Sequence, residues 1–404
     1  MGVFQLASIT IFKRIQENGM TPITNTEELN ALCQRLEKAA YITVDTEFLR
    51  TSTYYSKLCL IQVADEDGAF AIDPLANGLK LDAFFKLMNE CPALKVFHAA
   101  RQDIEILYQL SGNIPTPIFD TQIGAMVCGF GEQVGYETLV QSICNASLDK
   151  SIRFTDWSKR PLSDRQVSYA VSDVTHLRDI YKHLKAELEK TNRSAWLEEE
   201  MHILTSNDTY DQPPEDAWLR IKTRTNNRQF LGRLRELGAL REREAQKMNQ
   251  PRNRIIRDEV LLEIAAHPPK VMSDLETVRS LANRYSSGRG GQLIMDALKN
   301  AHDMNEEDLP LLPKKNDKYE KAGPVLELLK VLLKQVSKDK KVATKLIATG
   351  GDLEALALGR GENLALMRGW RYEIFGKKAT DLLNGKIFLS AKGTNILITD
   401  NAEN

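Results

Sequence analysis

Residues 41–50, YITVDTEFLR, predict a buried β-strand that carries two acids. Side chains alternate along a strand, so Asp45 and Glu47 share one face. Two carboxylates this close repel each other, and burial adds a further cost unless a cation compensates. Two interpretations stay open: both acids point at solvent, or both belong to a functional site. The apolar residues Val44 and Phe48 on either side argue against the first.

The segment around this strand alternates between strand and helix patterns from about residue 22 to residue 205. Strands are predicted over 41–48, 57–65, 69–73 and 93–98. Helices are predicted over 27–39, 81–91 and 101–110. A long helix closes the segment, and its start is marked by Ser163 and Gln166, which are spaced as a capping box. This order predicts an α/β domain with a mixed sheet flanked by helices.

Two further groups of polar residues lie where such a sheet would place a site. Asp103 follows the strand that ends near His98 and falls in the first turns of the next helix. Alone, it could simply be a partner of the helix dipole, but strand ends commonly build the sites of α/β sheets. Tyr169 and Asp173 are four residues apart on the long helix and therefore share a face, although a surface pair would have the same spacing.

The combination of Asp-x-Glu, a later Asp and Tyr-x-x-x-Asp resembles the DEDD exonuclease superfamily, in its tyrosine-bearing subgroup. The stretches VDTEF, VFHAARQDIEIL, IFDTQIGA and DWSKRPLSDRQVSYAVSDVTHL narrow the resemblance to the bacterial ribonuclease D family, over residues 22–385. The resemblance implies a ribonuclease H-like sheet. It also implies that Asp45, Glu47, Asp103 and Asp173 bind two divalent cations, Mg²⁺ or Mn²⁺, and that Tyr169 orients the attacking water.

One position departs from the superfamily pattern. Many members have Asn where this chain has Ala99. We do not interpret this change as a loss of activity.

Phosphodiester hydrolysis explains why these residue types occur together. Two divalent ions can activate a water and stabilise the leaving oxygen, and hard ions such as Mg²⁺ prefer carboxylate oxygens. A tyrosine with a pKa of about 10 is a poor base at neutral pH. Tyr169 is therefore expected to position the water by a hydrogen bond.

Beyond residue 210 the β patterns almost vanish, and two all-α helical bundles are expected. The stretch GDLEAL…LMRGWRYEIFG resembles the helicase-and-RNase-D C-terminal (HRDC) module. We expect an extension over 1–21, the exonuclease domain over 22–205 and two HRDC-like domains over 212–300 and 315–390. Residues 391–404 are expected to be a short tail.

Basic residues predict the nucleic-acid contacts. Residues 222–257 hold eleven Lys or Arg against three Glu, in a chain whose net charge is -1. Such an excess favours backbone contacts with nucleic acid, although a solvated charged face is the simpler alternative. The candidate substrate-binding residues are Lys159, Arg160, Arg233 and Arg241.

Other features narrow the class of protein. The five cysteines form no C-x-x-C pair and the histidines show no metal-binding spacing, so reduced thiols are expected and a zinc site is not. No apolar run reaches the roughly 18 to 20 residues that span a bilayer, and no GxxxxGK[ST] loop indicates nucleoside triphosphate binding. We expect a cytoplasmic monomer that does not associate with membranes.

The expected activity is metal-dependent 3′–5′ exoribonuclease cleavage that trims structured RNA and releases 5′-mononucleotides. The resemblance implies tRNA precursors as substrates. A 3′–5′ DNA exonuclease stays open because the same metal site serves both polymers. A non-catalytic nucleic-acid adaptor is a further alternative, disfavoured by the presence of all five site residues.

Overall fold

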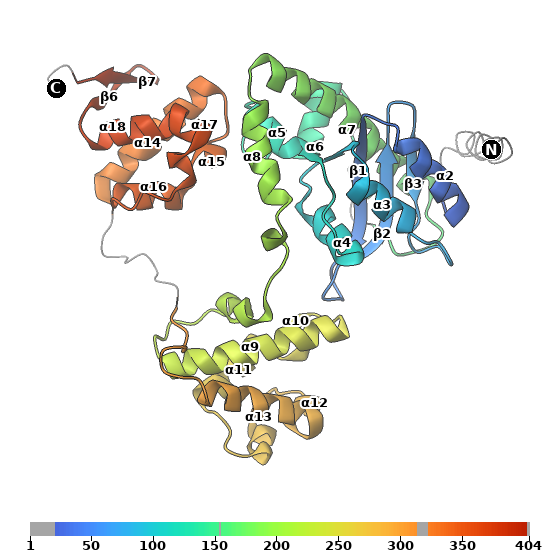
Figure 1. Ribbon diagram of the computed structural model, residues 1–404, viewed down its shortest axis with the longest axis vertical. Helices are drawn as coiled ribbons and strands as arrows, with labels where there is room; N and C mark the ends of the chain where they lie inside the picture. Colours follow the sequence, from blue (N-terminus) through green and yellow to red (C-terminus); the bar gives the residue numbers. More distant parts are fainter. Residues whose placement is uncertain (1–20, 153–154, 313–321, 402–404) are drawn as a thin grey trace. The chain divides into compact units, whose positions relative to one another are not determined.

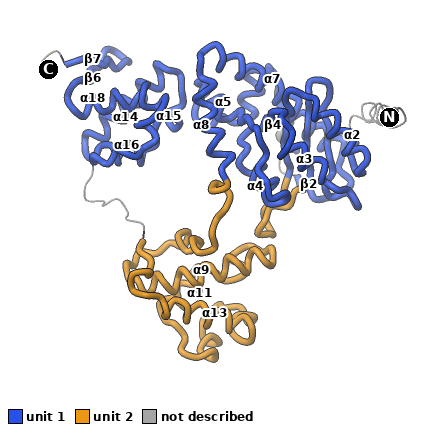
Figure 2. Tube along the Cα trace, in the orientation of Figure 1, with its two compact units in different colours: residues 1–47, 59–206, 318–404 blue, residues 48–58, 207–317 orange. Residues whose placement is uncertain are grey.

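The computed structural model describes residues 21–152, 155–312 and 322–401. The extension predicted over 1–21 lies outside the described residues except for its last residue. The chain divides into two compact units, shown in Figure 2. Unit 1 comprises residues 1–47, 59–206 and 318–404, and unit 2 comprises residues 48–58 and 207–317.

A five-stranded mixed sheet organises the first part of the chain (Figure 1). Its order is β3-β2-β1-β4-β5, in which β1 pairs with β4 and β4 with β5 in parallel, whereas β2 and β3 are antiparallel. The strands are β1 (Tyr41–Leu49), β2 (Lys57–Ala64), β3 (Ala69–Ile72), β4 (Leu94–Phe97) and β5 (Ile118–Asp120). The mixed sheet predicted from the sequence is confirmed, and β5 is an additional edge strand that the sequence patterns did not predict.

Helices flank this sheet and contribute to its core. They are α2 (Thr26–Leu36), α3 (Asp82–Glu90), α4 (Arg101–Ser111), α5 (Thr121–Val127), α6 (Tyr136–Leu139), the π-helical turn η1 (Val140–Cys144), the short 3-10 turn η2 (Lys150–Ile152), α7 (Asp164–Lys190) and α8 (Ser194–Leu204). The predicted capping box of α7 is present: the Ser163 hydroxyl accepts from the Gln166 N–H, and the Gln166 side chain accepts from the Ser163 N–H. This cap fixes where the helix begins and hence which side chains face the sheet.

Unit 2 is built from helices around an apolar core. They are η3 (Asn207–Thr209), η4 (Pro214–Arg220), α9 (Arg228–Met248), α10 (Arg252–Ile255), α11 (Asp258–Ala266), η5 (Met272–Thr277), α12 (Asn283–Ser286) and α13 (Gly288–His302). Leu231, Leu234 and Leu237 of α9 are fully buried at helical spacing. Residues 48–58, which comprise the link between β1 and β2 and the adjoining strand ends, belong to the same unit. Within it, the Arg252 guanidinium carbon lies 4.7 Å from the centroid of the Tyr54 ring.

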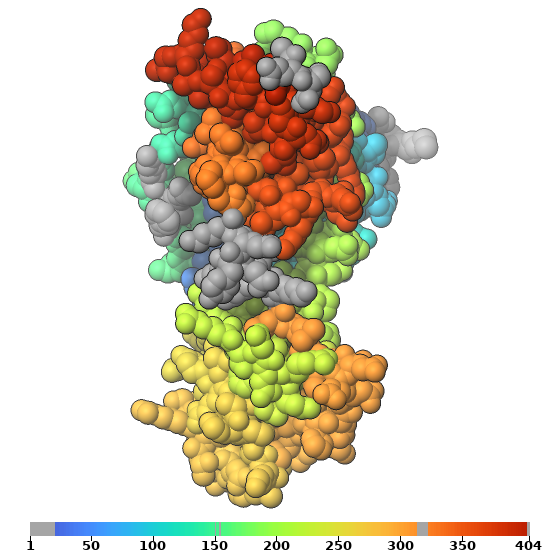
Figure 3. Space-filling model, turned by 90° about the vertical axis from the view of Figure 1, so that its left-hand side faces the viewer, coloured from blue at the N-terminus to red at the C-terminus, as the bar shows by residue number. Residues whose placement is uncertain are grey.

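Residues 322–401 form a C-terminal module within unit 1, part of whose surface Figure 3 shows in orange to red. Its elements are α14 (Gly323–Lys340), α15 (Thr344–Ile347), α16 (Gly350–Ala357), η6 (Ala365–Met367), α17 (Gly369–Arg371), η7 (Tyr372–Gly376), α18 (Lys377–Leu383), β6 (Ile387–Lys392) and β7 (Asn395–Asp400). The β6–β7 hairpin corrects the prediction of a tail over 391–404. Short runs of β-branched, aromatic and other apolar residues in KIFLSAK and NILITD favour strands.

Aromatic and ionic contacts attach this module to α8. The Trp370 ring stacks on Trp196 with centroids 4.5 Å apart and planes 10° from parallel. Arg371 forms ion pairs with Glu199 and Glu200. Trp370 therefore packs against α8. No described helix is both long and apolar enough to cross a membrane.

Candidate active site

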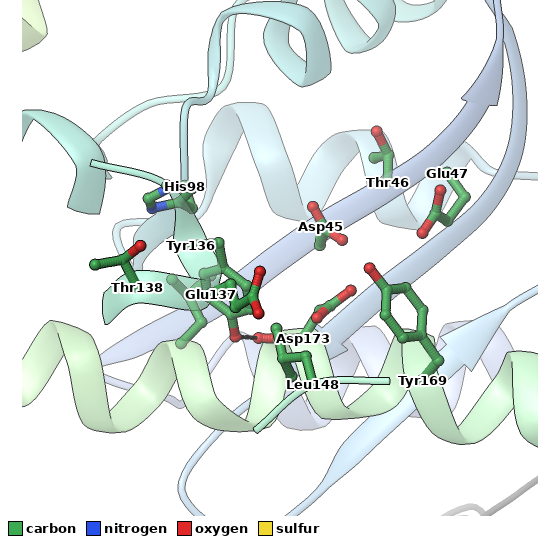
Figure 4. A pocket seen from close by; sticks show the side chains of 12 residues that line it. Asp45, Thr46, Glu47, His98, Tyr136, Glu137, Thr138, Leu148, Tyr169 and Asp173 are labelled. Carbon is green, nitrogen blue, oxygen red and sulfur yellow. Dashed lines mark hydrogen bonds between the residues drawn. The ribbon is translucent and has the colours of Figure 1, made fainter. Parts of the chain in front are cut away.

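Three of the predicted acids converge at one point. Asp45 and Glu47 project from the same face of β1, and Asp173 projects from α7. One carboxylate oxygen of each acid lies within 4.8 Å of the others. Figure 4 shows these side chains turned toward one another, with the Tyr169 hydroxyl directed at the same space. The solvent-facing alternative for the strand acids is therefore wrong.

The position of α7 sets the geometry of this cluster. Tyr169 and Asp173 lie four residues apart on the helix and share a face, as predicted. Asp173 is buried, and the Tyr136 hydroxyl donates a hydrogen bond to its backbone carbonyl (Figure 4). Trp157 is also buried, and its ring centroid lies 6.3 Å from that of Tyr169.

Asp103 lies beside this cluster in the first turn of α4. It is buried, and the Thr46 hydroxyl donates to its carboxylate. The loop before α4 is held by Asp120, whose carboxylate accepts from the backbone N–H groups of Ala99 and Ala100. Ala99 has a φ of 56°, in the left-handed region where Asn is enriched among non-glycine residues.

Burial makes this group of acids electrostatically costly. It raises the pKa of Asp45 to about 6. It raises the pKa of Asp103 well above its usual range, and the negative charge of Asp45 raises it further. A divalent cation would offset both effects, because it favours the charged carboxylates. The donors are all oxygens, which suits Mg²⁺ or Mn²⁺ and fits the metal dependence of DEDD exonucleases.

The acids open into a cavity of about 450 Å³. Its lining includes several residues that the sequence analysis did not single out, namely Thr46, Tyr136, Glu137, Thr138 and Leu148. His98 also lines it, and burial lowers the pKa of its imidazole to about 4, so the ring is neutral at pH 7. Thr46 could have been suspected because it lies between the two acids. No local sequence pattern marks Tyr136 as a site residue, because its contact with Asp173 forms only in the folded chain.

Arg160 corrects one substrate-binding prediction. Its guanidinium forms a two-point ion pair with Asp73 at 2.6 Å and donates to the Cys59 and Trp157 carbonyls. These contacts use its donors within the domain, so Arg160 is a structural residue. Lys159 is exposed, and its role as a substrate contact stays a prediction.

Arg241 requires the same correction, whereas the role of the half-buried Arg233 as a substrate contact stays a prediction. Arg241 is 3% exposed, donates to the Ile256 carbonyl and pairs with Asp258 at 2.5 Å. Arg233 is half-buried and donates to the Ala265 carbonyl at 2.7 Å. The basic residues of 222–257 are therefore not all at the surface, because the interior accommodates an arginine when backbone carbonyls can accept hydrogen bonds from it.

The change Arg241→Met is expected to lower the free energy of unfolding by about 1–3 kcal/mol, because it leaves the buried Ile256 carbonyl without its donor. Urea denaturation of the full chain measures this loss. Arg254→Met is the matched control, since Arg254 is exposed. Equal stability of the two variants would contradict a structural role for Arg241.

Comparisons with known proteins identify the family to which this chain belongs. Residues 20–189 match the 3′–5′ exonuclease family, and residues 230–298 match the HRDC domain. Ribonuclease D of Jannaschia sp. (strain CCS1) is 47% identical over 94% of this chain and 99% of its own length. Ribonuclease D of Sphingobium indicum is 46% identical over 93% and 98%, respectively.

A solved structure shows the same arrangement of elements. The crystal structure of Escherichia coli RNase D, described as an exoribonuclease involved in structured RNA processing, aligns with a TM-score of 0.74 and 28% identity. The alignment covers 90% of this chain and 98% of the other. With relatives this similar over nearly the whole length, the chain belongs to the ribonuclease D family.

Proposed function

We propose that this protein is a metal-dependent 3′–5′ exoribonuclease that trims the 3′ ends of structured RNA, including tRNA precursors, and releases 5′-mononucleotides. The observation that carries the proposal is the convergence of Asp45, Glu47 and Asp173 on one cavity beside Tyr169. Membership of the ribonuclease D family supports RNA as the substrate class.

The four acids share one role in the proposed mechanism. Asp45, Glu47, Asp103 and Asp173 would hold two divalent cations, which supply the activated water and stabilise the leaving 3′-oxygen. The Thr46 hydroxyl keeps the Asp103 carboxylate oriented. Tyr169 donates or accepts one hydrogen bond that aligns the water with the scissile phosphorus, and the phenol keeps its proton.

The exposed basic residues of unit 2 are the proposed RNA contacts. Of the eleven basic residues in 222–257, six donate to carbonyls, carboxylates or sulfur within the unit, namely Arg228, Arg233, Arg235, Arg241, Arg243 and Arg252. The other five are exposed, namely Lys222, Arg224, Lys247, Arg254 and Arg257. Their contacts with the RNA backbone would be independent of sequence and weakened by salt.

The enzyme is further proposed to act as a cytoplasmic monomer without a nucleoside triphosphate. All five cysteines are free thiols, which suits a reducing compartment. Light scattering of the purified chain, with and without RNA, measures its oligomeric state.

An assay with a uniformly labelled tRNA precursor tests the function and its metal dependence. With Mg²⁺ or Mn²⁺ we expect stepwise shortening from the 3′ end and release of 5′-mononucleotides, and with excess EDTA we expect none. Adding back Mg²⁺ should restore activity, since the carboxylates stay in place. Faster cleavage of single-stranded DNA would instead support the DNA exonuclease, and binding without cleavage under any metal would support the adaptor.

The change Tyr169→Phe is expected to lower kcat by about 10–100-fold with little change in KM, which corresponds to losing one hydrogen bond of about 1.5–3 kcal/mol to a charged centre. Single-turnover cleavage at saturating Mg²⁺ measures the effect. The Mg²⁺ concentration for half-maximal rate should not move, because the phenol is not proposed as a metal ligand. An unchanged kcat would remove Tyr169 from the mechanism.

A further inference from the structure

A second group of metal-binding side chains lies outside the proposed active site. Cys144 lies at the end of η1, and His176 and Asp179 lie on α7. One ligand atom of each residue lies within 4.8 Å of the others. Within the described residues, this group and the Asp45–Glu47–Asp173 cluster are the two sets of three that meet this spacing.

These residues come together because two of them share a face of α7 and the third lies at the end of η1, which packs against that helix. His176 and Asp179 are three residues apart on α7, so they lie on one face of the helix. The short helix α6 runs directly into η1, and the residue that follows η1, Asn145, is in a left-handed conformation with φ 53°. The Cys144 thiol reaches the same face of α7, where its sulfur lies 3.8 Å from the His176 carbonyl oxygen.

The chemistry of the three ligands differs from that of the active site. A thiolate, an imidazole and a carboxylate together suit Zn²⁺ and similar borderline-soft ions, whereas all-oxygen sites suit Mg²⁺ and Mn²⁺. We propose that Cys144, His176 and Asp179 bind one divalent cation of the zinc class, with water in the fourth position. Cys144 and His176 are half-buried and Asp179 is exposed, so the ion has an entry path from solvent.

The spacing of the ligand atoms is compatible with such a site. Zinc–ligand bonds of about 2.0–2.3 Å at tetrahedral angles place ligand atoms about 3.5 Å apart. The ligand atoms are at most 4.8 Å apart, so side-chain shifts of about 1 Å would bring them to the separation that zinc requires. Asp179 can supply much of this movement because its side chain is exposed.

No short sequence motif reveals this site, because Cys144 and His176 are 32 residues apart. The ion would join η1 to α7 one turn beyond Asp173. At the other end of the α6–η1 segment, the Tyr136 hydroxyl already joins it to α7 through the Asp173 carbonyl. Bound cation would therefore stabilise a wall of the active-site cavity without contacting the cavity itself.

Cobalt substitution tests the proposal directly. Co²⁺ is added to the full chain in excess Mg²⁺, which competes for the carboxylate site. We expect a thiolate-to-cobalt charge-transfer band in the near ultraviolet that saturates at one equivalent and disappears when Zn²⁺ is added. Cobalt at Asp45, Glu47 and Asp173 cannot give this band, since none of these ligands is a thiolate.

Two cysteine variants show whether cobalt binds at the proposed site or at any half-buried thiol. Cys144→Ser should abolish the band, whereas Cys128→Ser should retain it. Cys128 is the matched control because it is also half-buried and its sulfur lies 3.9 Å from another α7 carbonyl, that of Leu184. Circular dichroism and Mg²⁺-dependent cleavage of RNA confirm that each variant is folded.

Zinc affinity gives a second readout. His176→Gln should weaken Zn²⁺ binding by more than the roughly 10–100-fold typical for loss of an outer-shell partner. Binding should also release about one proton, from the Cys144 thiol, whose pKa is raised by burial and by Asp179. Absence of the band in the unaltered chain, its survival in Cys144→Ser or its equal loss in Cys128→Ser would each overturn the proposal.

Discussion

Replacing Asp45 with Asn is expected to lower the rate of RNA cleavage by at least about 10³-fold while RNA affinity is nearly unchanged. Asp45 lies at the centre of the site, within 4.8 Å of the other carboxylates and in electrostatic contact with Asp103. Metal ions contribute several kcal/mol to the transition state of such a reaction, and each 1.36 kcal/mol is a factor of ten in rate. The amide keeps the shape of the side chain but loses the charge that holds the cations.

Single-turnover cleavage and equilibrium RNA binding, measured on the same preparation, separate the two effects. Asp67→Asn is the matched control, because it removes an equal charge from a side chain that is 81% exposed. That variant should cleave at the rate of the unaltered chain. Substantial cleavage by Asp45→Asn would refute the assignment of the site, and a parallel loss of RNA binding would indicate misfolding.

Replacing Asp120 with Ala is expected to produce the largest loss of stability, about 2–4 kcal/mol of unfolding free energy. Its buried carboxylate accepts from four backbone N–H groups, those of Ala99, Ala100, Gln122 and Ile123. An unsatisfied polar group costs about 1–3 kcal/mol, part of which water and local repacking recover. The same change should lower cleavage, because Ala99 and Ala100 precede the helix that carries Asp103.

Urea denaturation of the full chain measures the stability change. Asp149→Ala is the matched control, since that exposed carboxylate also accepts from a backbone N–H, of Ser151. Its free energy of unfolding should be nearly unchanged. If Asp120→Ala were as stable as this control, the loop before α4 would have another source of order.

Local patterns predicted four of the five strands and the faces that the candidate site residues share, whereas the roles of those residues came from the resemblance to a family. Strand alternation placed Asp45 and Glu47 on one face, and helical spacing placed Tyr169 beside Asp173. The strand β5 escaped prediction because three residues are too few to show a period. Tyr136 escaped because its contact with Asp173 depends on the tertiary fold, as does the meeting of Cys144 with His176.

Charge patterns were less reliable than apolar ones. The excess of basic residues over 222–257 indicated a surface, yet Arg241 is almost fully buried. An arginine carries several donors on a long apolar stem, so it can satisfy interior carbonyls as readily as it contacts solvent. Which arginines do so depends on where carbonyls are left unpaired, and the sequence does not show this.

Unit 2 is built from two segments that lie far apart in the sequence, so one is synthesised well before the other. Its residues 48–58 leave the ribosome long before their partners, since Tyr54 accepts a hydrogen bond from Arg252, 198 positions later. At about 5–20 residues per second, this interval lasts about 10–40 s. Residues 48–58 therefore cannot form their final contacts until much of 207–317 has been synthesised. In a chain that ends at residue 206, the residues that contact 48–58 in unit 2 would be missing.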